Sequence, residues 1–300
     1  MDQSRRRMGE SSAPIHHGEV LQGMFRDRGT ARRGLVTLPC PLYCVRARFA
    51  SDGMADVTVS PGWRTKARTA ARLALSAYGL PPGGHLEISS DVPLGRGFGS
   101  STSDVLAAIG AVQDRYALRL TSAEKARLAV RAEIASDSMM FESTAVLFAQ
   151  REGEVIEDFG HPLPAMFVLG FGSRPAQGGR GVDTLSLPPA RYTDDDVLEF
   201  AELRAMLREA VLAKDVALLG HVATASTRLN QRHLPVPQLD RILNIVQEAR
   251  ALGLQISHSG DVAGLLFDRD DPALTVRSTH AEELLRDIGI VESWKFATNG

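Results

Sequence analysis

A short glycine-rich segment carries the strongest chemical signal in the chain. Residues 92–102 read VPLGRGFGSST, with three glycines alternating along the segment before three hydroxyl side chains. Because glycine has no β-carbon, the backbone N–H groups of such a loop can approach a ligand closely. A helical pattern starts at Ser100, so its free N–H groups and positive dipole end would face the loop. The segment therefore predicts an anion site, with phosphate as its usual occupant.

Two common phosphate-binding motifs fit this segment poorly. A P-loop requires a lysine before its serine or threonine, and no lysine lies near the segment. A dinucleotide-binding turn requires Gly-x-Gly-x-x-Gly, whereas the segment reads Gly-x-Gly-x-Gly-Ser-Ser. Backbone amides, Arg96 and a divalent cation would then balance a polyphosphate, with Ser101 facing Mg²⁺ and Ser100 or Thr102 touching phosphate. A plain loop with a helix cap is the alternative interpretation.

A pair of carboxylates follows in the segment RAEIASD. Glu133 ends a helical pattern whose apolar face is Leu128, Val130 and Ile134, and Asp137 follows four residues later at the break. The segment therefore supplies an acidic pair at the end of a helix, and a solvated turn is the alternative for Asp137.

Three segments together resemble the GHMP kinases, the family of galactokinase, homoserine kinase, mevalonate kinase and phosphomevalonate kinase. VPLGRGFGSSTSD is similar to the family's Pro-x3-Gly-x-Gly-Ser-Ser-Ala motif. APIHHGEVLQG at 13–23 resembles the first motif, and LQISHSGDVAGLLF at 254–267 resembles the third. Both take the form of the L-threonine kinase branch, which is associated with cobalamin biosynthesis. The resemblance thus spans nearly the whole chain.

The resemblance implies an α+β GHMP kinase fold with two domains. After a disordered arm at 1–12, an N-terminal α/β ATP-binding domain at 13–160 would carry the phosphate loop. A C-terminal ferredoxin-like α/β sandwich at 161–300 would carry the third motif. The active site would lie in the cleft between the two domains.

The resemblance also assigns roles to residues. With ATP and Mg²⁺ as cofactors, Ser101 and Glu133 would hold the metal, and Asp137 would act as a base or orient the acceptor hydroxyl. These three form the predicted catalytic set. The predicted ATP-binding residues are Pro93, Gly95, Arg96, Gly97, Gly99, Ser100, Ser101 and Thr102.

The acceptor side is less closely defined by the motifs. Glu19 and Gln22 belong to the first motif, which borders substrate in this family, so Glu19 could receive an amino group and Gln22 a carboxyl or hydroxyl group. Asp137 and Ser138 would also contact the acceptor, although Ser138 replaces the asparagine of the homoserine kinase pattern. Arg180, in a glycine-rich loop, could capture a carboxylate or the transferring phosphate. A polar hairpin and an ordinary solvated loop are the alternatives for these residues.

The resulting hypothesis is ATP- and Mg²⁺-dependent phosphorylation of an amino-acid hydroxyl, with L-threonine giving O-phospho-L-threonine. The same transfer to another small alcohol, such as homoserine, a hydroxylated amino acid or a sugar-like intermediate, stays open. A catalytically silent nucleotide-binding relative is the alternative from a different class.

Bulk composition favours a small-molecule partner. The 300 residues carry a formal net charge of −2 and no basic block beyond Arg5–Arg7, which argues against nucleic-acid binding. The sequence contains no run of 18 apolar residues, which a membrane-spanning helix would need. Its first residues also lack the apolar region of a signal peptide, so a cytoplasmic protein is expected. Cys40 and Cys44, the two cysteines, are interpreted as buried reduced thiols. A homodimer is left open.

Hydrophobic periodicity predicts the elements that would position these residues. Residues 13–90 are mainly strand, with separate strands at RGLVTLP and YCVRARFA and a helix at 65–78. Two helices follow between 100 and 136, the second with a capping box from Thr121 and Glu124. Strands after Phe141, helices between 193 and 251, a strand pair, a helix at 278–288 and a final strand complete the chain.

Overall fold

The computed structural model describes residues 8–93, 98–173, 191–257 and 261–300. Its strands are β1 (Gly9–Asp27), β2 (Thr30–Ala50), β3 (Val57–Ser60), β4 (Gly84–Ser90), β5 (Val146–Ala149), β6 (Glu154–Asp158), β7 (Phe167–Gly172), β8 (Gly253–Ile256), β9 (Val262–Phe267) and β10 (Ser293–Ala297). Its helices are α1 (Thr65–Ala77), α2 (Ser100–Arg115), α3 (Ser122–Glu133), α4 (Asp194–Ala213), α5 (Val216–Leu229), α6 (Leu239–Glu248) and α7 (Leu274–Asp287), with a 3₁₀ turn at Asn230–Arg232.

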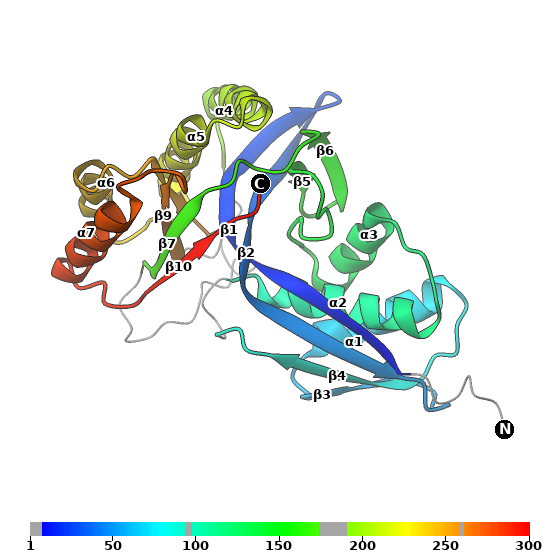
Figure 1. The fold of residues 1–300 in the computed structure, drawn as a ribbon. Coiled ribbons are helices and arrows are strands. Elements are labelled where there is room, and N and C mark those ends of the chain that lie inside the picture. The colour runs from blue at the N-terminus through cyan, green and yellow to red at the C-terminus, as the bar shows by residue number, and fades with distance from the viewer. Residues whose placement is uncertain (1–7, 94–97, 174–190, 258–260) are drawn as a thin grey trace.

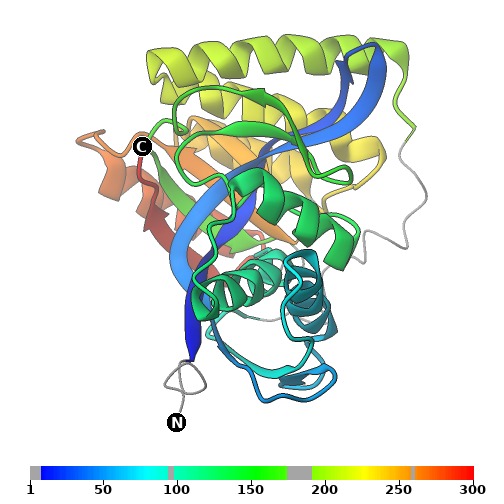
Figure 2. The same cartoon turned by 90° about the vertical axis from the view of Figure 1, so that its right-hand side faces the viewer.

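A long antiparallel hairpin of β1 and β2 runs through the molecule (Figure 1). One sheet, in the order β10-β7-β9-β8-β1-β2-β4-β3, contains it, and β5 and β6 extend from β2. Helices α1 to α3 gather with β3 and β4 at one end of the hairpin, and Figure 2 shows its other end beside α4. Residues of β1 therefore contact elements from both halves of the chain.

Strand β2 is continuous although the sequence predicts two strands in its place. Pro39 and Pro41 lack the N–H group that a regular ladder requires, which suggests a break. The structure places three extra residues there, because Pro14 pairs with Cys44 while the adjacent Ile15 pairs with Cys40. This bulge takes Pro41 out of the ladder, while Pro39 stays opposite His16, and the strand continues through both.

The second half of the sheet has the ferredoxin-like arrangement that was predicted. Strands β7, β8, β9 and β10 occur in the order β10-β7-β9-β8, and every neighbouring pair is antiparallel. Helices α4 to α6 connect β7 to β8 and α7 connects β9 to β10, which gives a βαββαβ pattern. Buried side chains of α6 and α7, such as Ile242 and Leu285, share a core cluster with Phe171 and Leu265 of the sheet.

Residues 9–12 correct the predicted extent of the N-terminal arm. They belong to β1 and pair with residues 46–49 of β2. The prediction of a disordered arm over residues 1–12 is therefore wrong for residues 9–12. Residues 1–7 lie outside the described part of the chain. Gly9 also packs tightly on α2, where a β-carbon would overlap the Ala111 carbonyl oxygen. A polar sequence is thus ordered because β2 offers it backbone partners.

Other predicted elements agree with the structure to within a few residues. The capping box of α3 is confirmed, since the Thr121 side chain accepts from the Glu124 N–H and the Glu124 carboxylate accepts from the Thr121 N–H. The predicted division at residues 160 and 161 falls between β6 and β7. Among the helices of the described residues, none is long and apolar enough to cross a bilayer.

Helix α5 packs on β8 through glycine. A β-carbon at Gly220 would overlap the Leu252 carbonyl oxygen, and one at Gly253 would overlap the Gly220 carbonyl oxygen. The two backbones therefore approach too closely for any side chain between them.

We expect Gly220→Ala to lower the free energy of unfolding by about 1–3 kcal/mol, because the added methyl group overpacks this contact. Alanine in an unobstructed helix would instead stabilise by about 0.5–1 kcal/mol, so the sign of the change is diagnostic. Urea unfolding measures it. Gly62→Ala is the control, since no heavy atom lies within 4 Å of a β-carbon there. A stabilised Gly220→Ala protein would contradict the packing described.

Candidate active site

The end of the glycine-rich loop rests against β1. Gly99 adopts a left-handed conformation with φ of 64°, and α2 begins at the next residue, Ser100. A β-carbon at Gly99 would overlap the His16 imidazole, so glycine is required on steric as well as conformational grounds. The His16 backbone N–H donates to the Phe98 carbonyl oxygen over 3.3 Å. The first motif thus supports the loop directly.

Two hydroxyl groups at the start of α2 hold the carboxylate that ends α3. Ser101 Oγ donates to Glu133 Oε2 over 2.7 Å, and Thr102 Oγ1 donates to Glu133 Oε1 over 2.8 Å. The structure therefore brings the predicted pair Ser101 and Glu133 together. Hydroxyl and carboxylate oxygens are the ligands that Mg²⁺ prefers, so the donor set fits this ion.

The predicted apolar face of α3 is wrong at its last turn. Glu133 is only 3% exposed, whereas Ile134 is 63% exposed. Ile134 has a positive φ of 74°, which ends the helix and turns its side chain outward. The carboxylate is buried because the two hydroxyl groups of α2 satisfy it, a contact that periodicity does not reveal.

Burial changes the acidity of Glu133. Removal from water raises its pKa, and the charge of Asp137 adds to this, while the hydrogen bonds from Ser101 and Thr102 lower it. The balance raises the pKa to about 7. A divalent cation would favour the ionised carboxylate, so metal and proton compete for this group near neutral pH.

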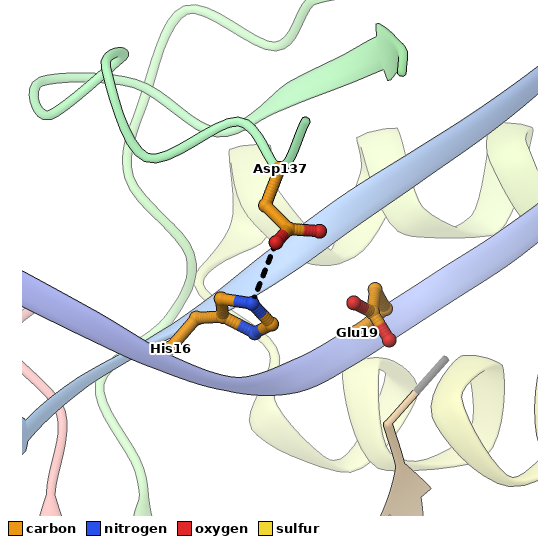
Figure 3. A group of neighbouring side chains, drawn as sticks. All are labelled: His16, Glu19 and Asp137. Carbon is orange, nitrogen blue, oxygen red and sulfur yellow. Dashed lines mark hydrogen bonds and ion pairs between the residues drawn. The ribbon is translucent and has the colours of Figure 1, made fainter. Parts of the chain in front are cut away.

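Asp137 lies next to this pair. Its Oδ2 accepts from Thr102 Oγ1 over 3.1 Å and lies 2.8 Å from His16 Nε2 (Figure 3). Oxygens of Asp137 and Glu19 and a ring nitrogen of His16 all lie within 4.8 Å of one another. Glu19 is 4% exposed and comes from β1, so the acceptor residue predicted in the first motif does reach the carboxylate predicted to act on the hydroxyl.

His16 is a site residue that the sequence left undefined, because adjacent histidines alternate faces on a strand. Burial lowers its pKa, but the charge and hydrogen bond of Asp137 and the charge of Glu19 raise it to about 9. The Gly18 N–H lies 2.9 Å from Nδ1, which accepts this hydrogen bond in the neutral ring. In the neutral and the charged ring alike, the Nε2 proton points to Asp137.

Lys66 supplies a cation that the sequence did not predict for this site. Its Nζ donates to Ser101 Oγ over 3.1 Å. An ion pair between Arg64 and the buried Asp104 ties the start of α1 to α2, which places Lys66 at the phosphate loop. No local motif could have revealed it, since 35 residues separate Lys66 from Ser101.

The remaining acceptor residues occupy different positions. The Gln22 N–H donates to Ser226 Oγ, and its carbonyl oxygen accepts from Asn230, so this part of β1 is joined to α5. Ser138 Oγ donates to Thr37 Oγ1 of β2 over 2.8 Å and is buried. Of the predicted ATP contacts, the structure describes Pro93 and 99–102. Gly95, Arg96, Gly97, Arg180 and the third-motif turn at 258–260 lie outside the described residues.

Comparisons with known proteins agree with this arrangement. The family models for the GHMP kinases N terminal domain and the GHMP kinases C terminal match residues 65–144 and 207–284. An L-threonine kinase of Citrobacter freundii is 26% identical over 269 residues, covering 88% of each chain. A homoserine kinase of Lactococcus lactis subsp. cremoris is 27% identical and covers 62% of this chain and 63% of its own.

Solved structures show the same fold. Homoserine kinase from Cytophaga hutchinsonii superposes with a TM-score of 0.70 at 16% identity, over 100% of this chain and 96% of its own. A structure described as MDDEF in complex with MVAPP, AMPPCP and magnesium superposes with a TM-score of 0.68 at 16% identity, over 98% of both chains.

The chain belongs to the GHMP kinase family. It is accordingly a phosphotransferase whose acceptor is the hydroxyl group of a small molecule.

We expect the carboxyl group of Glu133 to titrate with a midpoint at about pH 7 in the metal-free protein, protonated below and ionised above. Infrared difference spectroscopy follows the C=O band of the protonated acid. The band should be missing in Glu133→Gln and unchanged in Glu142→Gln, an exposed control. Mg²⁺ should move the midpoint to lower pH. A midpoint near the ordinary glutamate value of about 4 would contradict the burial described here.

Proposed function

We propose that this kinase transfers the γ-phosphoryl group of ATP to the side-chain hydroxyl of an amino acid, with L-threonine as the acceptor. One observation carries the proposal. Thr102 Oγ1 lies within hydrogen-bonding distance of both Glu133 and Asp137, so the carboxylates to which we assign metal binding and hydroxyl binding lie beside each other, next to the start of α2. Phosphoryl transfer requires these two functions next to the phosphate site.

The phosphates of ATP would lie at the N-terminus of α2. There the free N–H groups and the helix dipole favour negative charge, and Lys66 adds a formal positive charge. We assign the nucleotide contacts to Pro93 and to 95–97 and 99–102. Ser101 and Glu133 would hold Mg²⁺, which when bound spreads the negative charge of the phosphates.

Asp137 would hold the acceptor hydroxyl in line with the γ-phosphate. In a loose transition state the nucleophile needs little deprotonation beforehand, so orientation by a fixed carboxylate contributes much of the effect. The hydroxyl proton would pass to Asp137 as the new bond forms.

An amino-acid acceptor is supported by Glu19. Its buried carboxylate approaches Asp137, which suits a substrate that carries an ammonium group close to its reacting hydroxyl. Gln22, Ser138 and Arg180 would complete the acceptor site. The L-threonine kinase of Citrobacter freundii, matched over most of both chains, makes threonine the first acceptor to test.

Homoserine is the second candidate acceptor. The homoserine kinase of Lactococcus lactis and the superposed homoserine kinase structure favour it. Ser138 argues against it, because a serine stands where the homoserine kinase pattern has an asparagine.

An ADP-release screen over alcohol acceptors tests the proposal. We expect L-threonine to show the highest kcat/KM among L-threonine, L-serine, L-homoserine, other hydroxylated amino acids and simple sugars. Turnover of another alcohol with none of threonine would refute the acceptor and leave phosphotransfer intact. Thermal stabilisation by ATP and Mg²⁺ with no turnover on the whole panel would instead indicate a silent nucleotide-binding relative.

Lys66→Met should raise the KM for ATP about tenfold, because a hydrogen bond from a charged donor to phosphate is lost. The KM for the acceptor should change little. Lys214→Met is the matched control, since Lys214 is an exposed lysine at the end of α4, away from α2. Steady-state kinetics with both substrates varied measures the difference. An unchanged KM for ATP in Lys66→Met would exclude a phosphate contact.

A further inference from the structure

His16 makes three contacts that connect the phosphate loop to Asp137. The imidazole is 3% exposed and occupies the space in front of Gly99. The His16 backbone N–H binds the carbonyl oxygen of Phe98, and Nε2 lies 2.8 Å from Asp137 Oδ2. One residue of β1 therefore touches both the end of the loop and the carboxylate that faces the acceptor.

The geometry fixes the role of each ring nitrogen. Nδ1 lies 2.9 Å from the Gly18 N–H, which can only donate, so in the neutral ring Nδ1 accepts and Nε2 carries the proton. Protonation of the ring would keep the same proton on Nε2. His16 is thus a donor to Asp137 in either form.

Asp137 depends on outside groups for its orientation. It follows the end of α3 in an irregular segment between that helix and β5. Its Oδ2 lies within hydrogen-bonding distance of Thr102 Oγ1 of α2 and His16 Nε2 of β1. Because the single hydroxyl proton of Thr102 is also directed at Glu133, the Nε2 proton of His16 is the donor that holds this oxygen in place.

We propose that His16 is a positioning residue for phosphoryl transfer, which holds the Asp137 carboxylate toward the acceptor and keeps it in register with the end of the phosphate loop. This inference rests on the proposed function, because it takes Asp137 as the group that contacts the acceptor hydroxyl. His16 itself acts through Asp137.

Neighbouring His17 offers a matched control. It is also buried, but its Nδ1 lies 2.9 Å from Gln255 Oε1 and its Nε2 accepts from Trp294 Nε1. It therefore lies on the opposite face of β1, away from Asp137. A substitution at His17 disturbs the same strand and the same loop residue, since the His17 ring lies 5.9 Å from that of Phe98, but it does not touch the carboxylate.

The test compares His16→Ala, His16→Gln, Asp137→Asn and the double variant His16→Ala with Asp137→Asn, using the best acceptor of the screen. We expect His16→Ala to lower kcat about 100-fold, the size of effect that misplacing a reacting group produces. His16→Gln keeps an amide donor and should recover about tenfold of that loss. The KM for ATP should stay within about threefold, and His17→Gln should leave kcat within about threefold.

Coupling between the two residues decides whether His16 acts through Asp137. In the Asp137→Asn background, His16→Ala should cost less than about twofold, because the group it positions is already gone. A merely structural role predicts the same loss in both backgrounds and no rescue by glutamine. Wild-type kcat in His16→Ala, or additive losses, would overturn the proposal.

A readout without turnover separates this inference from the proposed function. In ¹⁵N NMR of the histidine rings, Asp137→Asn should move the Nε2 resonance of His16 and leave those of His17 in place.

The outcomes distinguish failure of the proposed function from failure of this inference. If the His16 resonance moves but no alcohol is phosphorylated, the proposed function fails and with it the role of His16 in transfer. If alcohols are phosphorylated and Asp137→Asn is slow while His16→Ala is fast, only the His16 inference fails. If His16→Ala does not fold, His16→Gln in both backgrounds decides the same question.

Discussion

Two carboxylates within reach of one hydroxyl group are the constraint around which the site is arranged. Glu133 is buried and Asp137 is half-buried, both lie within hydrogen-bonding distance of Thr102 Oγ1, and their charges repel. A group of this kind is stable only when donors or cations surround it. Ser101, His16 and Lys66 supply them from α2, β1 and α1. The protein therefore holds a site of excess negative charge that a divalent cation would relieve.

The long hairpin allows these groups to meet. His16 and Glu19 come from β1, at a point where its pairing with β2 shifts register between them. Glu19 is also the residue through which β1 pairs with β8, so the irregular part of the strand lies where the two halves of the sheet join. A regular strand would send alternate side chains to opposite faces. The irregularity changes that alternation between His16 and Glu19, so that both side chains approach Asp137.

The sequence predicted the parts of the site that are encoded by local motifs. The loop, Ser101, Glu133 and Asp137 follow from residue types at short spacing, and the family fold follows from three such motifs. Lys66 could not be predicted, because it meets Ser101 only through the packing of α1 on α2. The burial of Glu133 in place of Ile134 was missed for a related reason, since hydrophobic periodicity cannot weigh two specific hydrogen bonds. Likewise, the continuity of β2 through two prolines depends on a bulge that only the partner strand defines.

The aromatic contact between Phe98 and Trp294 has a consequence for folding. Phe98 ends the glycine-rich loop, and its ring centroid lies 5.1 Å from that of Trp294 in β10. The ring of His17, from β1, contacts both. Phe98 and Trp294 lie almost two hundred positions apart in the chain, so their contact closes late and adds to the non-local contacts that slow folding. During synthesis, the support behind the phosphate loop stays incomplete until β10 has emerged from the ribosome. A nascent chain of this kinase would therefore gain its nucleotide site as one of the last events of folding rather than with its N-terminal half.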